Sequence, residues 1–158
     1  MSKLFRQIAL CVLAGGLSVS AHAGLTKDQV VERVKKAHDF YKKNGKDKAI
    51  EEFNNQSSPF NSDDAYMFGQ LLDAGATQPI HRNPKIRGKT MGELKDADGR
   101  FIIKELNKIC ETKGAGWFDY KWPKPDNTGI DLKSSYVEKM TDGAGNSMCI
   151  GTGIPTPK

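Results

Sequence analysis

The sequence predicts an α+β domain in which an antiparallel sheet of five strands carries an N-terminal helix and a second, covering helix. Two observations predict this class. Apolar residues recur at helical spacing just after residue 24 and again near residue 100. Short extended segments bounded by turn residues make up most of the remainder. Without a targeting segment, the 158-residue chain has the length of one domain with one hydrophobic core.

Residues 1–23 have the three-part form of a secretory signal. Lys3 and Arg6 precede an apolar run over residues 8–17, and Ala21-His22-Ala23 supplies an A-x-A cleavage site. The alternative, a membrane anchor, needs about 20 apolar residues, whereas this run is shorter and is interrupted by Gly15, Gly16 and Ser18. We therefore expect cleavage after Ala23, a periplasmic protein, and one domain over residues 24–158.

The charge of the mature chain is small. The signal contains two of the 24 Lys and Arg residues and none of the 19 Asp and Glu residues, so removing it leaves a formal charge of +3. Basic residues are spread along the chain among acidic ones, which is typical of a solvated surface and argues against a nucleic-acid partner. No later apolar stretch reaches membrane-spanning length, so we expect any signal to pass through a partner protein.

The first half of the chain predicts two helices and a hairpin. Thr26 and Gln29 form a capping box at the start of the first helix, whose apolar stripe continues to Tyr41 before Gly45 ends it. A second short helix is expected over residues 47–54. Residues 66–72 and 76–80 then predict a hairpin around a turn at residues 73–75.

The second half predicts the covering helix and three strands. Asp98 is expected to cap a helix that runs to about Lys113 with one apolar side facing the core. Strands are expected over residues 117–122, 133–140 and 147–154, because turns rich in Gly, Asn and Asp separate them.

Cys110 and Cys149 are the cysteines that remain once Cys11 leaves with the signal. A disulfide between them is permitted in an oxidising compartment, and two buried free thiols are the alternative. No C-x-x-C motif or histidine cluster occurs, so we expect no metal and no cofactor. His38 is interpreted as a packing residue, and without a nucleophile–base arrangement we do not expect an enzyme.

Five segments carry a family resemblance. They are residues 43–54 (KNGKDKAIEEFN), 83–89 (NPKIRGK), 95–99 (KDADG), 116–125 (GWFDYKWPKP) and 133–137 (KSSYV). In this order and spacing they resemble the Cache family of extracytoplasmic sensor domains, in its single-domain form. The resemblance implies a PAS-like sheet with a ligand cavity beneath its helical cover. Most relatives belong to membrane-spanning receptors or kinases, and we expect a free-standing secreted form here.

The aromatic strand is the first candidate for the ligand site. Phe118, Tyr120 and Trp122 alternate onto one face. Packing in the core alone is the alternative, but the resemblance implies that this face lines the cavity. Tyr120 is then expected to contact the ligand through its hydroxyl, and Trp122 to form a wall.

The resemblance adds further candidates for ligand binding, namely Tyr66, His81, Arg87, Lys133 and Tyr136. The family's second strand usually ends in His-Pro, whereas Pro79 precedes His81 here, which puts the role of His81 in doubt. Lys133 and Tyr136 are three positions apart, so a regular strand would turn only one of them toward the cavity. Cations on the loop over residues 82–89 would favour a carboxylate ligand.

Two functions remain open from the sequence. The first is a periplasmic sensor-type module that presents a small molecule to a membrane sensor or transport partner. The second is an accessory protein-interaction module whose cavity is filled by its own aromatic side chains. A ligand-dependent rise in melting temperature separates them, because binding to the native state alone stabilises it.

Overall fold

The computed structural model describes residues 24–62, 65–123 and 128–156. Its helices are α1 (Lys27–Asn44), α2 (Lys46–Asn54) and α3 (Ile102–Lys113). Its strands are β1 (Met67–Leu71), β2 (Thr77–Gln78), β3 (Lys89–Thr90), β4 (Ala115–Pro123), β5 (Ile130–Thr141) and β6 (Ser147–Pro155). The predicted α+β class is confirmed, while the predicted signal segment lies outside the described residues.

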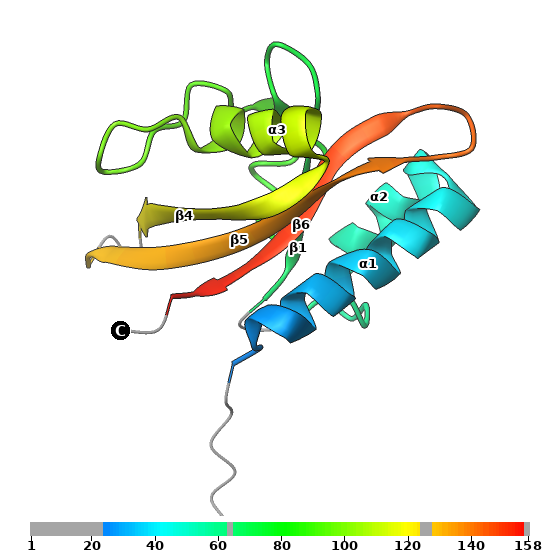
Figure 1. Cartoon of the computed structure of the whole chain (residues 1–158), viewed down its shortest axis with the longest axis horizontal. Coiled ribbons are helices and arrows are strands. Elements are labelled where there is room, and N and C mark those ends of the chain that lie inside the picture. Colours follow the sequence, from blue (N-terminus) through cyan, green and yellow to red (C-terminus); the bar gives the residue numbers. More distant parts are fainter. Residues whose placement is uncertain (1–23, 63–64, 124–127, 157–158) are drawn as a thin grey trace, which may run out of the picture.

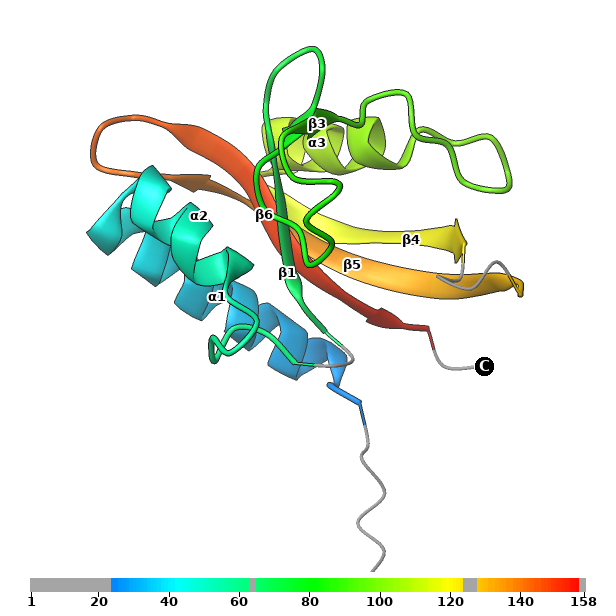
Figure 2. The same cartoon turned by 180° about the vertical axis from the view of Figure 1, so that it is seen from behind.

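Four strands form the main antiparallel sheet, in the order β1-β6-β5-β4. Helices α1 and α2 lie against one face of this sheet, and α3 lies against the other (Figures 1 and 2). The sheet therefore separates two apolar layers, one beneath α1 and α2 and one beneath α3.

The fifth predicted strand, over residues 76–80, is not part of this sheet. Its residues Thr77–Gln78 pair with β3 in a separate two-stranded ribbon, and Ile80 forms a bridge to Gly69 of β1. Pro79 has no amide hydrogen, so it cannot extend that bridge into a ladder. The main sheet consequently has four strands, and the chain turns away beside β1 to place His81.

Helix α1 begins as its capping box predicts. The hydroxyl of Thr26 accepts a hydrogen bond from the Gln29 amide at 3.3 Å, and the Gln29 side chain accepts one from the Thr26 amide at 2.9 Å. Gly45 has a φ of 82°, a conformation that favours glycine, and this residue ends α1 and precedes α2. The buried side of α1 packs against the sheet and comprises Val30, Val34, Ala37 and Tyr41.

Helix α3 begins later than predicted, and Asp98 is not its N-cap. Phe101 occupies the cap position, and no side chain caps the helix. The carboxylate of Asp98 instead accepts a hydrogen bond from Nζ of Lys121 at 2.6 Å. Asp98 is a residue type suited to capping a helix, but in the folded chain its carboxylate binds Lys121 of β4. The loop that leads into α3 is therefore tied to β4.

A disulfide between Cys110 and Cys149 joins α3 to β6. Their Cα atoms are 5.8 Å apart, so of the two states left open by the sequence the structure has the bridged one. Both residues are fully buried, and Leu106 packs in the same cluster one helical turn earlier. The bond therefore holds the C-terminal half of the covering helix against the sheet.

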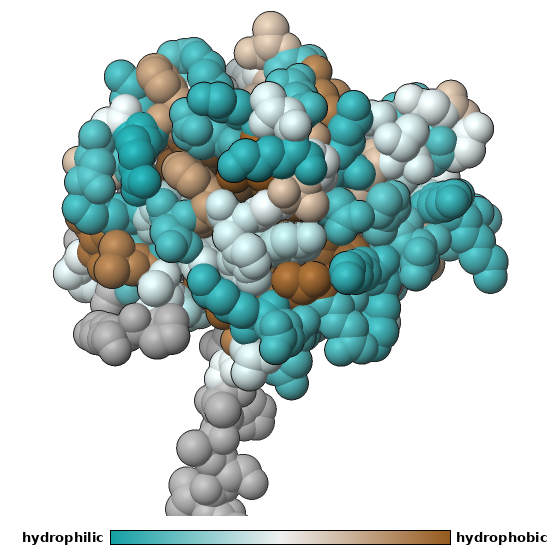
Figure 3. Space-filling view, viewed as in Figure 1, coloured by the Kyte–Doolittle hydropathy of each residue, from teal (hydrophilic) through white to brown (hydrophobic). Residues whose placement is uncertain are grey.

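The surface seen from the side of Figure 1 is mostly hydrophilic, with apolar residues scattered over it (Figure 3). Among the described residues, the large apolar side chains that stand exposed are Ile130 and Leu132 of β5, each 52% exposed. Scattered apolar residues of this kind are ordinary on a protein surface.

Candidate functional site

The α3-facing side of β4 carries the aromatic side chains that the alternation predicts. Phe118 stacks on Tyr120 with ring centroids 5.6 Å apart, and the ring of Trp122 meets that of Tyr120 edge-on at 5.9 Å. Trp117 points to the other face, where it packs against Tyr136. The hydroxyl of Tyr120 is 3.0 Å from that of Ser135, so its hydrogen bond is made within the sheet.

A small cavity, here called the inner compartment, lies between β4, β1 and α3. Its volume is about 20 Å³, close to the minimum that holds one water molecule. Tyr120 and Trp122 line it, as the sequence predicts. Phe118 is not among the lining residues and stacks on Tyr120. The other lining residues are Tyr66, Phe68, Gln78, His81, Ile102, Ile103 and Leu106.

Sequence reasoning did not find Phe68 or Gln78 as lining residues. Phe68 belongs to an apolar strand segment that is equally consistent with core packing. Gln78 is 3% exposed and precedes Pro79, a position where no sequence pattern marks a buried amide. Their role depends on how β1 and β2 lie against α3, which only the folded chain shows.

Lys133 brings a positive charge to this region. Its Nζ lies 5.1 Å from the ring centre of Tyr66 and 6.0 Å from that of Trp122, and it is the cross-strand partner of Tyr120. Burial lowers the pKa of Lys133, and the carboxylate of Asp131 opposes that shift. An ammonium group in such surroundings gains from a further anionic partner.

Tyr136 does not belong with the other candidates. It lies on the opposite face of the sheet from Lys133, against Trp117, because three steps along a regular strand reverse the direction of the side chain. Its inclusion among the ligand-binding residues is corrected: Lys133 is the member of this pair on the cavity side.

His81 is 8% exposed and its orientation is fixed by its neighbours. Its amide donates to Oδ1 of Asn54 at 3.0 Å, and its Nδ1 accepts a hydrogen bond from the Asn83 amide at 2.9 Å. With Nδ1 as acceptor, the neutral ring carries its hydrogen on Nε2. Burial lowers the pKa of His81 to about 4, and the charge of Lys133 adds to the lowering.

Arg87 has a different role from the predicted one. Its Nε donates to the carbonyl of His81 at 2.7 Å, and its Nη2 donates to the carbonyl of Asn54 at 3.1 Å. The guanidinium therefore clamps the backbone around His81, and it does not line the cavity. Arg82, on the same loop, lies over the ring of Tyr66 with its Cζ 5.9 Å from the ring centre.

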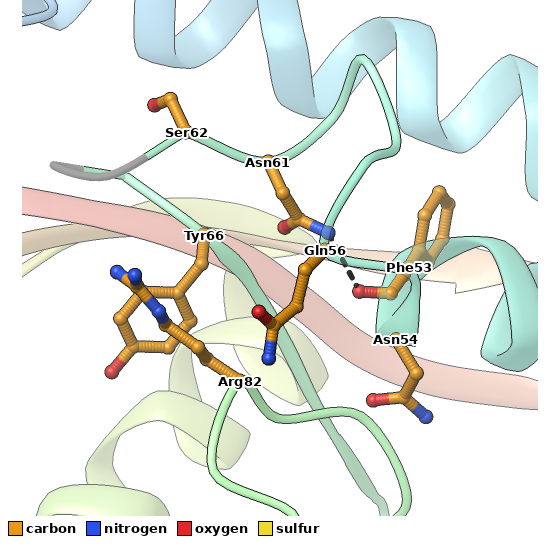
Figure 4. A pocket seen from close by; sticks show the side chains of 7 residues that line it. All are labelled: Phe53, Asn54, Gln56, Asn61, Ser62, Tyr66 and Arg82. Carbon is orange, nitrogen blue, oxygen red and sulfur yellow. Dashed lines mark hydrogen bonds between the residues drawn. The ribbon is translucent and has the colours of Figure 1, made fainter.

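A second cavity, here called the outer compartment, has a volume of about 90 Å³ (Figure 4). Tyr66 lines both compartments, and Arg82 lines the outer one. The remaining outer residues come from the end of α2 and the loop before β1, and they are Phe53, Asn54, Gln56, Asn61 and Ser62. These polar loop residues follow no periodic pattern, so no sequence signal indicates this cavity.

No helix among the described residues is both long and apolar enough to cross a membrane. Nor do His, Cys, Asp and Glu side chains gather there in groups of three or more that could hold a metal ion.

The match to a protein-family model shows which family this chain belongs to. A family model described as a Cache domain matches residues 23–156. The chain belongs to the Cache domain family. Its candidate site therefore lies in a fold that the family shares, with α3 as the covering helix.

Known proteins similar to this Cache domain include chemotaxis receptors. The methyl-accepting chemotaxis protein McpP of Pseudomonas putida is 29% identical over 69 residues, which is 43% of this chain but 13% of that protein. The chain thus matches a small part of this curated relative. A match of this length does not extend the activity of the whole chemotaxis protein to this chain.

Three solved structures share the fold. The first, described as showing the structural basis for carboxylic acid recognition by a Cache chemosensory domain, has a TM-score of 0.64 at 23% identity and covers 82% of this chain and 92% of its own. A periplasmic sensor domain of a chemotaxis protein gives 0.59 at 20% identity, covering 82% and 90%. A methyl-accepting chemotaxis protein from Vibrio parahaemolyticus gives 0.54 at 24%, covering 79% and 80%.

Proposed function

We propose that this Cache domain is a periplasmic sensory module that binds a small carboxylate beside the aromatic wall of β4. In this proposal the domain acts through a membrane sensor or transport partner and catalyses no reaction. The observation that carries it is the half-buried cation of Lys133 next to an aromatic cavity with a neutral histidine. The Cache chemosensory domain described as recognising carboxylic acids, which has a similar fold, supports the same ligand class.

The charges around Tyr66 suit a carboxylate. Arg82 and Lys133 both lie over its ring, and the charge of Arg82 adds to the lowering of the pKa of Lys133. Asp131 is the acidic group that acts on Lys133. A carboxylate placed here accepts charge-assisted hydrogen bonds from Lys133 and from Nε2 of His81, and the aromatic rings exclude water from those bonds.

The small volume of the inner compartment specifically favours the second candidate function. A cavity of about 20 Å³ is largely filled by the protein's own side chains, as expected for a protein-interaction module without a ligand. For a carboxylate to enter, side chains around the cavity must move. The two functions therefore make opposite predictions about added ligands.

A thermal-shift screen decides between them. Protein purified from the periplasm is heated with millimolar acetate, propionate, butyrate, lactate and succinate at constant pH and ionic strength. We expect at least one acid to raise the melting temperature in proportion to the logarithm of its concentration once it is in excess. If none of these acids raises it, the carboxylate proposal is wrong and the self-filled module is favoured.

Two substitutions then locate the site. We expect Trp122→Ala to weaken binding by roughly 2 kcal/mol or more, because it removes an aromatic wall of the inner compartment. Asp119→Ala is the control, since it alters an exposed residue on the other face of β4 and should leave binding nearly unchanged. Calorimetry measures both. Loss of binding in Asp119→Ala with normal binding in folded Trp122→Ala would place the pocket elsewhere.

A further inference from the structure

The inner compartment contains a polar side chain that a plain carboxylate leaves unused. Gln78 lines this cavity and is 3% exposed, and its side-chain amide makes no hydrogen bond within the described residues. A buried amide without partners destabilises a folded protein, so native proteins usually satisfy it with a water molecule or a ligand. The amide of Gln78 therefore still requires a partner.

The other deeply buried polar side chains around this cavity are already engaged. The hydroxyl of Tyr120 is paired with that of Ser135, and Nδ1 of His81 accepts a hydrogen bond from the Asn83 amide. In the proposed function, Nε2 of His81 donates to the carboxylate of the ligand. The amide of Gln78 is thus left for a second polar group of the same ligand.

The backbone on both sides of Gln78 is fixed. Its carbonyl accepts a hydrogen bond from the Gly88 amide at 2.7 Å, and its strand β2 pairs with β3. The carbonyl of the next residue, Pro79, accepts a hydrogen bond from Nδ2 of Asn54 at 2.9 Å. The side chain of Gln78 is therefore presented from a rigid position, as selective recognition of a ligand requires.

The chemistry of an amide selects the second group of the ligand. The amide nitrogen donates hydrogen bonds and the amide oxygen accepts them, and a hydroxyl group can both donate and accept. A carbonyl group only accepts, so it would leave the oxygen of Gln78 unsatisfied. An ammonium group only donates and would meet the charge of Lys133, and no Asp or Glu is among the described residues that line the cavity. A hydroxyl group therefore fits best.

We propose that Gln78 is a specificity-determining residue and that the ligand is a short hydroxycarboxylate, whose hydroxyl binds Gln78 while its carboxylate binds Lys133 and His81. This inference rests on the proposed carboxylate-binding function and narrows its ligand class. Carboxylates without the hydroxyl group still bind, but more weakly, because they leave the amide of Gln78 unpaired.

The experiment compares four three-carbon acids by calorimetry, namely propionate, lactate, 3-hydroxypropionate and alanine. They share one carboxylate and differ in the group on the second or third carbon. Affinities are measured for the unmodified protein and for Gln78→Met, because methionine has nearly the volume of glutamine but no amide.

Gln70→Met is the matched control. Gln70 is also a fully buried glutamine whose amide has no hydrogen-bond partner, but it does not line the cavity. Thermal unfolding establishes that each variant is folded. The comparison of the four acids in the unmodified protein does not depend on either variant.

We expect the better of the two hydroxy acids to bind the unmodified protein about tenfold more tightly than propionate, the ratio that one additional hydrogen bond supplies. Alanine should bind no more tightly than propionate. Gln78→Met should reduce the tenfold ratio to near one, and Gln70→Met should leave it unchanged.

Equal affinities of propionate and both hydroxy acids for the unmodified protein would overturn this inference and leave carboxylate binding intact. So would alanine as the tightest ligand, a ratio that survives in folded Gln78→Met, or a ratio that falls equally in Gln70→Met. If no acid binds at all, here or in the thermal-shift screen, the proposed function itself fails.

Discussion

Protonation of His81 should make the stability of this domain depend on pH in a specific window. Burial lowers its pKa from 6.5 to about 4 in the folded protein. The unfolded chain therefore takes up a proton as the pH falls below about 6.5, while the folded chain does not until about pH 4. Protonation stabilises the unfolded state in this window, so stability is fully present above about pH 6.5 and is lost as the pH falls toward 4.

The size of this loss in the free energy of unfolding follows from the two pKa values. One pKa unit corresponds to about 1.4 kcal/mol, so the drop from 6.5 to about 4 amounts to roughly 3 kcal/mol. The side chain is 8% exposed, so solvent screens little of this effect. That is a large fraction of the stability of an ordinary domain.

Urea unfolding of the unmodified protein and His81→Asn between pH 7.5 and pH 4 measures this effect. Asparagine does not titrate, and its side-chain oxygen can accept the hydrogen bond that Nδ1 accepts from the Asn83 amide. We expect the unmodified protein to lose roughly 3 kcal/mol more than the variant across the window. Carboxylates titrate alike in both proteins and cancel in the difference. Parallel curves for the two proteins would refute the argument.

The disulfide and the close contacts of β6 yield two further predictions. Replacing Cys110 and Cys149 together by alanine should lower the free energy of unfolding by about 4 kcal/mol in the chain-entropy model for a loop with a separation of 39 residues; unchanged urea midpoints would contradict it. Gly151→Ala should destabilise the domain by roughly 1–3 kcal/mol or more, because an added Cβ would lie 2.1 Å from the carbonyl oxygen of Tyr136. Gly143→Ala is its control, since nothing lies within 4 Å of the added atom, and equal thermal stability of the two variants would count against the packing argument.

The elements of this domain could be predicted from local patterns. The capping box at Thr26 and Gln29 placed the start of α1, and the alternation of residues 117–122 placed Tyr120 and Trp122 on one face of β4. Both predictions depend on neighbouring residues in the chain, whose geometry a helix or a strand fixes by itself. The Asp98 prediction had the same local basis and was wrong, because Lys121 lies near it only in the folded chain.

The sequence by itself determined the α+β class, the order of its helices and of the strands of the main sheet, the aromatic face of β4 and, through five segments, the Cache family. Only the tertiary structure decided which side chains meet around the cavity. It placed Lys133 beside Tyr66 and moved Tyr136 to the far face, and it turned Arg87 into a clamp on the backbone of His81. The physical reason is that periodicity assigns a side chain to a face, whereas contacts between α2, β1, β5 and the loop over residues 81–89 depend on how distant segments pack.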